Sequence, residues 1–331
     1  MMRPLLRGRL LSLHHGVKYG LSARWCHALP EQDTRAADAT MLLRAMGEEQ
    51  ALAQAVTPLP LSSAAADDMA THGVVRMAGL SEPTATSLRA FVIEQLGLSL
   101  EHETGYDDGH ERSHFSAVLG STASTEALVE GDETRWDLRL PLLPPLLPAL
   151  RELLGGPLGA ALTALVGDHA ELHELAAVIS APGAAPQVVH SDADWSPCAS
   201  MFSVFVALQH VDMNMGPTLF LRGTHTKAAH AMLGACRTPS VAQSFLAASD
   251  VRAAVLRCGE ASLYDRRLLH AGGRNSSWAT RVLFYLTFRT AGTVGDPWNA
   301  NSLRSELRGK LSLHQLRDSS AEALPMMRTP C

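Results

Sequence analysis

Acidic residues are missing from the start of the sequence, so the net charge of the whole chain understates how acidic the rest of it is. No Asp or Glu occurs before Glu31, whereas five Lys and Arg residues do, so the rest of the chain carries 23 basic and 33 acidic side chains. The formal net charge of the 331 residues is −5. The acidic body argues against a nucleic-acid-binding surface, which needs clustered Lys and Arg.

Cysteine pairs and long apolar runs are also missing. The five cysteines are scattered and contain no C-x-x-C pair, which excludes a zinc knuckle and a disulfide framework and favours a reducing compartment. The richest apolar stretches, 140–150 and 158–166, fall short of the roughly 18 residues that a membrane span needs. Because 46% of the residues are hydrophobic, a large core can form. We expect a soluble intracellular protein without a membrane span.

The first 30 residues are basic, rich in leucine and free of acids, a composition typical of an organelle transit peptide. An ordinary basic, disordered terminus explains the same composition equally well. We therefore assign residues 1–38 as a basic leader. The expected location is the cytoplasm, or the mitochondrion or plastid if the leader is a transit peptide.

Helical patterns dominate the first half of the chain after the leader. Apolar residues recur at three- and four-residue spacing, and proline or glycine ends each pattern. Residues 62–68 form a small-residue linker or a helix start, a short strand is expected at 73–77, and a polar loop at 102–114. The predicted helices are 39–56, 81–96, one beginning at Pro148, and 156–166.

After Gln187 the sequence pattern is typical of β-strands, with short apolar segments between Gly and Pro turns. Such spacing is typical of a sandwich or jelly roll. We predict a mainly β protein with flanking helices (α+β), in which N-terminal helices pack on a sandwich or jelly-roll core. The predicted strands are 171–180, 201–208, 218–221, 261–263 and 281–288, with a helical insertion at 240–254. The predicted parts are a helix and linker at 39–67, a single domain at 68–290 with its jelly-roll core at about 171–290, and a C-terminal extension at 291–331.

The tripeptide His190-Ser191-Asp192, followed 80 residues later by His270, is the first candidate for chemistry. In an extended strand residues i and i+2 share a face, so His190 and Asp192 can bind one ion. With His270 from a neighbouring strand they complete the two-histidine, one-carboxylate set of non-haem Fe(II) oxygenases. The tripeptide alone is weak evidence because it arises often by chance.

Arg281 is the second candidate. A strand, His270, a glycine-containing hairpin and a returning strand would bring Arg281 close to the metal. There it would share one strand face with Leu283, Tyr285 and Thr287. An inward arginine is costly unless paired, and the distal carboxylate of 2-oxoglutarate is a suitable partner. The alternative is a surface arginine on an outward-facing strand.

Three segments resemble the phytanoyl-CoA dioxygenase (PhyH)-like family of Fe(II)- and 2-oxoglutarate-dependent oxygenases. The first runs from Gln187 to Asp192, the second from Gly216 to His225, and the third from His270 through Asn275 to Arg281. The likeness extends over about residues 68–290 and implies that the jelly roll is a cupin-like double-stranded β-helix. Arg222 stands where proline is usual, and Thr218 and Thr224 replace the commoner Leu and Ser. These departures affect a turn and bear on the subfamily rather than on the chemistry.

The resemblance implies a dioxygenase in which His190, Asp192 and His270 hold Fe(II). Arg281 would bind the cosubstrate 2-oxoglutarate. Independently of the resemblance, Gln187 lies three residues before the first ligand and is a candidate for a contact either to the metal ligands or to the cosubstrate. With O₂, and ascorbate as a supporting reductant, a C–H bond of a small-molecule or lipid-like substrate would be hydroxylated, releasing succinate and CO₂. Because a carboxylate fills the Asp192 position, halogenation is disfavoured. The acidic body and a C-terminus unlike a peroxisomal signal disfavour an acyl-CoA substrate.

The other histidines receive ordinary interpretations. His102, His110 and His114 have a spacing that fits no shared face, so we expect exposed loop histidines. His225 ends a family segment whose histidine is usually structural. Asp194 and Trp195 either line the substrate mouth or form a capping turn.

Two other classes of protein stay open. One is a cupin-like metalloprotein with a different activity, which would not need Arg281. The other is a catalytically silent binding member of the fold. The sequence does not determine the oligomeric state.

Overall fold

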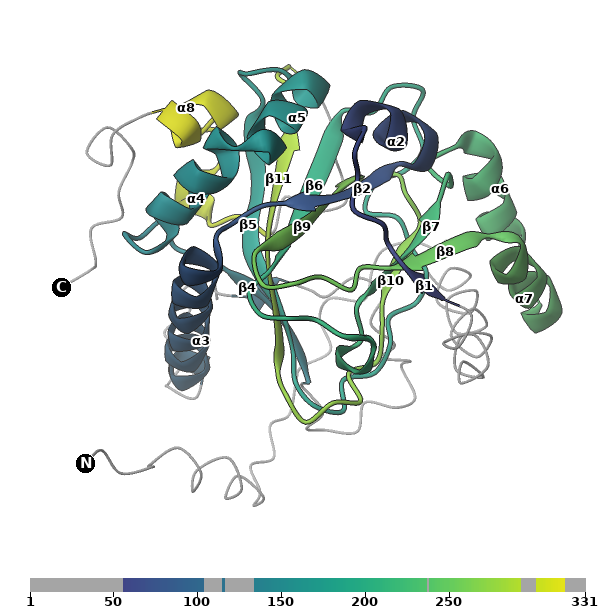
Figure 1. Cartoon of the computed structure of the whole chain (residues 1–331), viewed down its shortest axis with the longest axis horizontal. Coiled ribbons are helices and arrows are strands. Elements are labelled where there is room, and N and C mark those ends of the chain that lie inside the picture. Colours follow the sequence, from purple (N-terminus) through teal and green to yellow (C-terminus); the bar gives the residue numbers. More distant parts are fainter. Residues whose placement is uncertain (1–55, 104–114, 117–133, 237, 293–301, 319–331) are drawn as a thin grey trace, which may run out of the picture. The chain divides into compact units, whose positions relative to one another are not determined.

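Two facing sheets form the centre of the computed structural model, which describes residues 56–103, 115–116, 134–236, 238–292 and 302–318 (Figure 1). The larger sheet has the order β2-β9-β6-β11-β5-β4-β3, and the smaller has the order β1-β8-β7-β10. Neighbouring strands are antiparallel except for β1 and β8. The strands are β1 Thr57–Pro58, β2 Val74–Ala78, β3 Phe115–Ser116, β4 Arg135–Arg139, β5 Glu171–Ser180, β6 Met201–Ala207, β7 Thr218–Arg222, β8 Asp250–Ala253, β9 Glu260–Asp265, β10 His270–Gly272 and β11 Arg281–Arg289. This arrangement confirms the predicted jelly-roll core with flanking helices.

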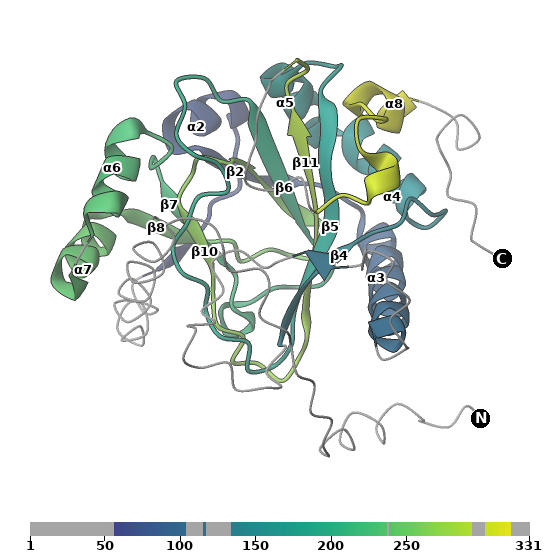
Figure 2. The ribbon, with the colours of Figure 1, turned by 180° about the vertical axis from the view of Figure 1, so that it is seen from behind.

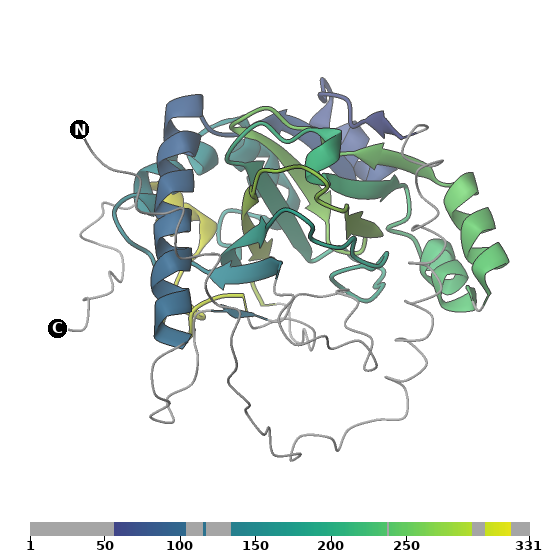
Figure 3. The ribbon, with the colours of Figure 1, turned by 90° about the horizontal axis from the view of Figure 1, so that it is seen from below.

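Helices cover the outer side of the larger sheet, and two more lie beside the smaller sheet (Figures 1 and 2). The first set includes α3, α4, α5 and α8, and the second is α6 with α7. Figure 3 shows α3 and the α6–α7 pair on opposite sides of the sheets. The helices are α2 Ala65–His72, α3 Glu82–Glu103, α4 Leu146–Gly155, α5 Pro157–Val166, α6 Lys227–Ala235, α7 Pro239–Ala248 and α8 Leu313–Asp318, with 3-10 turns η1 Met213–Met215 and η2 Ser305–Leu307.

Strand β11 shows where the main core lies. Its side chains alternate, and one set packs into a large apolar cluster with the helices that cover the larger sheet. The residues of this outward set are Val282, Phe284, Leu286 and Phe288. The other set, which begins with Arg281, faces the smaller sheet, and Arg281, Leu283 and Tyr285 line a cavity there. The helix-covered face is therefore the apolar core, while the space between the sheets carries polar side chains.

Most of the predicted elements are confirmed, and the differences have local causes. The predicted strand 171–180 and helix 156–166 agree with β5 and α5. Helix α3 continues to Glu103, beyond the predicted end at residue 96 and into the predicted loop. The predicted insertion 240–254 is wrong at its end, because α7 stops at Ala248 and the next residues pair with β7 as strand β8. Strand β4 and helix α6 were not predicted, and the predicted helix 39–56 lies almost wholly outside the described residues.

The C-terminal residues 302–318 belong to the core. Leu303, Leu307 and Leu313 are buried in the same cluster as β11, and the backbone N–H of Leu175 donates to the carbonyl of Ser302 at 2.9 Å. The described residues all fall within one unit, residues 36–331. The finer domain boundaries stay a prediction. None of the described helices is long and apolar enough to cross a membrane alone, although α4 and α5, bent by 73°, pass the same test as a pair.

Candidate active site

His190 and His270 come together through a backbone bridge between two segments. The His190 N–H donates to the His270 carbonyl at 2.9 Å, and the reverse bond is 2.8 Å. His270 begins β10, which pairs with β7 in the smaller sheet. The two imidazole rings therefore lie side by side, with centroids 4.5 Å apart.

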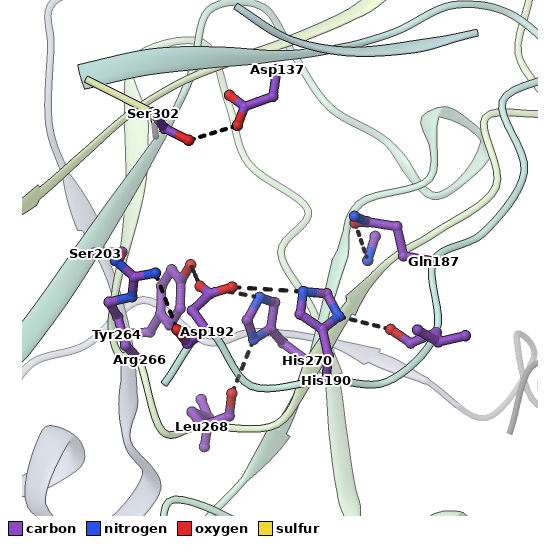
Figure 4. Close-up of polar contacts among 12 residues, drawn as sticks. Asp137, Gln187, His190, Asp192, Ser203, Tyr264, Arg266, Leu268, His270 and Ser302 are labelled. Carbon is purple, nitrogen blue, oxygen red and sulfur yellow. Dashed lines mark hydrogen bonds and ion pairs between the residues drawn. The ribbon is translucent and has the colours of Figure 1, made fainter. Parts of the chain in front are cut away.

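Asp192 completes a cluster with these two rings, as Figure 4 shows. Its Oδ1 lies 3.6 Å from the Nε2 of His190 and its Oδ2 lies 3.6 Å from the Nε2 of His270. We call His190, Asp192 and His270 the His–Asp–His group. One donor atom from each lies within 4.8 Å of the others, and within the described residues this is the one such group of His, Cys, Asp or Glu. Ligands bound at about 2.1 Å from one ion lie some 3 to 4 Å apart, so the spacing fits a single ion.

Backbone carbonyls orient both imidazole rings. The Nδ1 of His190 lies 2.8 Å from the carbonyl of Val188, and the Nδ1 of His270 lies 2.9 Å from the carbonyl of Leu268. A carbonyl only accepts, so each Nδ1 carries the proton and each Nε2 has a free lone pair. Both free lone pairs belong to the atoms nearest Asp192.

Burial and neighbouring charges set the protonation of the group. Burial, followed by the charge of His270, lowers the pKa of His190 to about 4. Burial alone would raise the pKa of Asp192, but His270, Arg266, His190 and the hydrogen bond from Tyr264 lower it to about 2. Near neutral pH the group therefore holds a neutral His190 and an ionised Asp192, the forms that bind a metal.

Two residues of β9 and its following turn hold Asp192 in place. The phenol of Tyr264 donates to Asp192 Oδ2 at 2.7 Å. Burial, together with the charge of Asp192, raises the pKa of Tyr264, so the phenol keeps its proton. The guanidinium of Arg266 donates to the Asp192 carbonyl at 3.1 Å, and the Asp192 N–H donates back to the Arg266 carbonyl at 2.9 Å.

A hairpin held by Asn275 brings Arg281 to the same cavity. Asn275 is fully buried, and its amide donates to the carbonyls of Ser180 and Ala279, each at 2.9 Å. Arg281 starts β11 and is 1% exposed. The prediction of an inward arginine is confirmed, and the alternative of a surface arginine is wrong.

Arg281 is a buried cation with spare hydrogen-bond donors. Its Nη2 donates to the Ser180 hydroxyl at 3.0 Å, whereas its Nε and Nη1 have no hydrogen-bond partner among the described residues. Burial and the charge of Arg135 lower the pKa of Arg281 to about 9. An unpaired buried guanidinium is costly, so this position favours an anion.

Arg135, on β4, is a site residue that the sequence interpretation missed. Its Nη2 donates to the carbonyls of Ala185 at 2.8 Å and Gly273 at 3.1 Å, while its buried Nη1 has no partner among the described residues. It pairs in register with Ser180, as Arg281 does from the other side of β5. The sequence pattern that could have predicted this strand is the alternation of Arg135, Asp137 and Arg139 with Trp136 and Leu138.

Gln187 lies in the same cavity, and its role as a contact stays a prediction. It lines the cavity with the His–Asp–His group, and its Oε1 accepts from the Gly272 N–H at 3.0 Å (Figure 4). Gly272 is two residues after His270 on β10, and Gln187 is three residues before His190. This hydrogen bond therefore connects the segment that leads to His190 with the strand that carries His270. The space between these residues, counted with its opening to solvent, is about 630 Å³.

The remaining histidines and the expected mouth residues lie elsewhere. His225 Nε2 lies 3.3 Å from the carbonyl of Ala70 and is outside the His–Asp–His group, as expected. Asp194 and Trp195 are absent from the cavity lining, and Trp195 instead lies under the ammonium of Lys227 at 5.7 Å. Of the loop histidines, His110 and His114 lie outside the described residues.

Comparison with known families identifies the chain. The family described as "Phytanoyl-CoA dioxygenase (PhyH)" matches residues 104–283, more than half of the sequence. The chain belongs to the phytanoyl-CoA dioxygenase family. The match includes His190, Asp192, His270 and Arg281, and it confirms the resemblance expected from the motifs. The protein is therefore an enzyme of the dioxygenase type.

Solved structures with a similar fold include three that show the range of this likeness. The alpha-ketoglutarate-dependent carbocyclase SnoK from nogalamycin biosynthesis is 18% identical, with a TM-score of 0.47 over 70% of this chain and 85% of that one. AviO1 from Streptomyces viridochromogenes is 18% identical, with a TM-score of 0.48 over 72% and 99%. HygX from Streptomyces hygroscopicus, with nickel and 2-oxoglutarate bound, is 13% identical, with a TM-score of 0.47 over 71% and 89%. No curated protein matches this member of the phytanoyl-CoA dioxygenase family.

Proposed function

We propose that this protein is an Fe(II)- and 2-oxoglutarate-dependent oxygenase that hydroxylates a small organic molecule. His190, Asp192 and His270 would hold the metal, and Arg281 would bind the cosubstrate. The observation that carries the proposal is Arg281. Its buried guanidinium lines the same cavity as the His–Asp–His group, and two of its nitrogens have no hydrogen-bond partner in the described part of the chain. Family membership supports the same cofactors.

The residues present fit both groups. Two imidazole Nε2 atoms and one carboxylate make the ligand set of non-haem iron oxygenases, which leaves open positions on the metal. The guanidinium of Arg281 fits a carboxylate through two parallel hydrogen bonds. Arg135, whose charge acts on Arg281, adds a second cation near it, suited to a dianionic cosubstrate. The bound iron and cosubstrate would supply the oxidising chemistry.

The protein's own residues would orient the reactants. The carbonyls of Val188 and Leu268 fix the tautomers of the two histidines, and Tyr264 fixes the carboxylate of Asp192. Phe205 and Tyr264 form part of an apolar wall that keeps water from the reacting groups. Asp192 occupies the ligand position that a halogenating relative would need for halide, which favours hydroxylation.

Succinate formation by the purified chain tests the proposal. We expect Fe(II)-dependent conversion of 2-oxoglutarate to succinate in the wild type, and none with His190→Ala or Asp192→Ala. Arg281→Ala should lose 2-oxoglutarate binding while keeping metal binding, which separates this function from a cupin-like metalloprotein that needs no arginine. Turnover that persists in both metal-site variants would refute the assignment.

A further inference from the structure

The cavity of the proposed oxygenase has a second polar end, which the iron and cosubstrate do not use. Asp137 on β4 and Glu174 on β5 line the same cavity as the His–Asp–His group and are 8% and 4% exposed. In Figure 4, Asp137, with Ser302 beside it, lies apart from Asp192 and the two imidazoles. Asp137 therefore lies apart from the metal ligands, whereas Glu174 shares the guanidinium of Arg266 with the Asp192 carbonyl.

The two carboxylates differ in how their charge is balanced. Glu174 forms an ion pair with Arg266 at 2.9 Å and accepts from the hydroxyl of Thr287. Asp137 accepts from two hydroxyl groups, Tyr285 at 2.9 Å and Ser302 at 2.8 Å, and within the described residues it forms no such ion pair. A carboxylate has about four acceptor positions, so two neutral donors leave room for another partner.

Burying an acid that forms no ion pair is costly, although the charge of Arg139 offsets part of the cost for Asp137. Burial, with a smaller effect from Glu174, raises the pKa of Asp137 to about 7. Hydrogen bonding to Ser302 alone does not need a charge, because an asparagine would accept the same bond. The carboxyl group is therefore suited to a cationic partner that arrives with a ligand.

Apolar and aromatic side chains connect Asp137 to the metal ligands. The rings form a chain of neighbours, measured between ring centroids. Tyr285 lies 5.4 Å from Phe205, Phe205 lies 5.4 Å from Tyr264, and Tyr264 lies 5.1 Å from His270. All four rings line the cavity. A small molecule held at Asp137 would lie along this wall and extend toward the His–Asp–His group.

Charge also separates this end from the cosubstrate. Arg135 and Arg281 stand at the first positions of β4 and β11, two residues before Asp137 and four before Tyr285, and an anion is favoured there. Asp137 is the next inward residue of β4 after Arg135, and it would repel a dicarboxylate. The cavity thus offers a cationic end for the cosubstrate and an acidic end for a ligand of the opposite charge.

We propose that Asp137, together with the Tyr285 phenol, binds a basic nitrogen of the organic substrate. The ligand class is a small molecule with a protonated amine and an apolar body. This inference rests on the proposed function, since the metal group would oxidise the molecule so held. Asp137 donates no group to the reaction and acts as a specificity residue.

Calorimetric titration with three ligands of matched length tests the inference. The probes are n-hexylammonium, n-hexanol and hexanoate, added to the full chain loaded with Mn(II) and 2-oxoglutarate. We expect n-hexylammonium to bind at least tenfold more tightly than n-hexanol, and hexanoate to bind most weakly. Asp137→Asn, which keeps the shape but not the charge, should remove the preference for the amine.

Ser302→Ala is the matched control, because it removes a hydrogen bond to Asp137 without changing the charge. The control should keep the preference within about threefold. Absence of hexylammonium binding, equal binding of alcohol and amine, or an unchanged preference in a folded Asp137→Asn would each overturn the inference. Titration of the same wild-type and Ser302→Ala samples with 2-oxoglutarate and Mn(II) reports separately on the proposed function. Circular dichroism verifies that Asp137→Asn is folded.

Discussion

Replacing Arg281 with methionine should make the empty protein more stable. The guanidinium is 1% exposed, and burial with the charge of Arg135 lowers its pKa from the usual arginine value to about 9. One pKa unit corresponds to about 1.4 kcal/mol, so holding this charge costs about 5 kcal/mol. Arg281→Met removes that cost and loses the bond to Ser180, worth about 1 kcal/mol. Buried charges replaced by apolar residues of similar size give gains of about 1 to 4 kcal/mol, so we expect about 3 kcal/mol.

Urea unfolding, with and without ligands, measures both this gain in stability and the loss of 2-oxoglutarate binding. Without ligands, Arg281→Met should have the higher free energy of unfolding. With Mn(II) and 2-oxoglutarate at 100 times its dissociation constant, the wild type should gain about 2.7 kcal/mol and the variant should gain almost nothing from the cosubstrate. Arg281→Lys keeps the charge and should show no gain in stability. A ligand-free Arg281→Met that is less stable than the wild type, or an equal response to 2-oxoglutarate, would refute the reasoning.

Two further predictions concern the other ends of the cavity. Tyr264→Phe removes the 2.7 Å hydrogen bond to Asp192, so Mn(II) affinity, measured by calorimetry, should fall by about tenfold while the fold is kept; an unchanged affinity would contradict the positioning role. The fold raises the pKa of Asp137 from 3.8 to about 7, so as pH rises the carboxyl group ionises in the unfolded chain before it ionises in the folded protein. Between pH 4 and 7 the free energy of unfolding of the wild type should therefore fall by about 4 kcal/mol relative to that of Asp137→Asn. Above pH 7 the difference should stay constant; urea unfolding across this range checks it, and a difference that does not change with pH would contradict it.

The proposed ligands could be predicted from the sequence because their signals are local. The spacing of His190 and Asp192, the hairpin glycines and the alternation after Arg281 depend on neighbouring residues, and the geometry agrees with them. The strand β5 is a long apolar run whose ends are marked by turns, so its bounds agree with the prediction.

Strand β4 could not be recognised because its burial pattern is reversed. Trp136 and Leu138 pack against the helices, while Arg135 and Asp137 face the space between the sheets. Charged residues on one face of a strand normally indicate solvent, and only the closed jelly roll turns that face inward. The partners of Asp137 come from residues 285 and 302, far away in the chain, so no local pattern predicts them.

Anaerobic titration with Fe(II) and 2-oxoglutarate tests the central claim most directly, namely that the His–Asp–His group and Arg281 together form an oxygenase site. Chelation of the iron by the cosubstrate gives a weak visible absorption band. The wild type should develop this band at one equivalent of iron, and His270→Ala should not develop it. A band of unchanged intensity in His270→Ala, or none in the wild type at saturating ligand, would contradict the account.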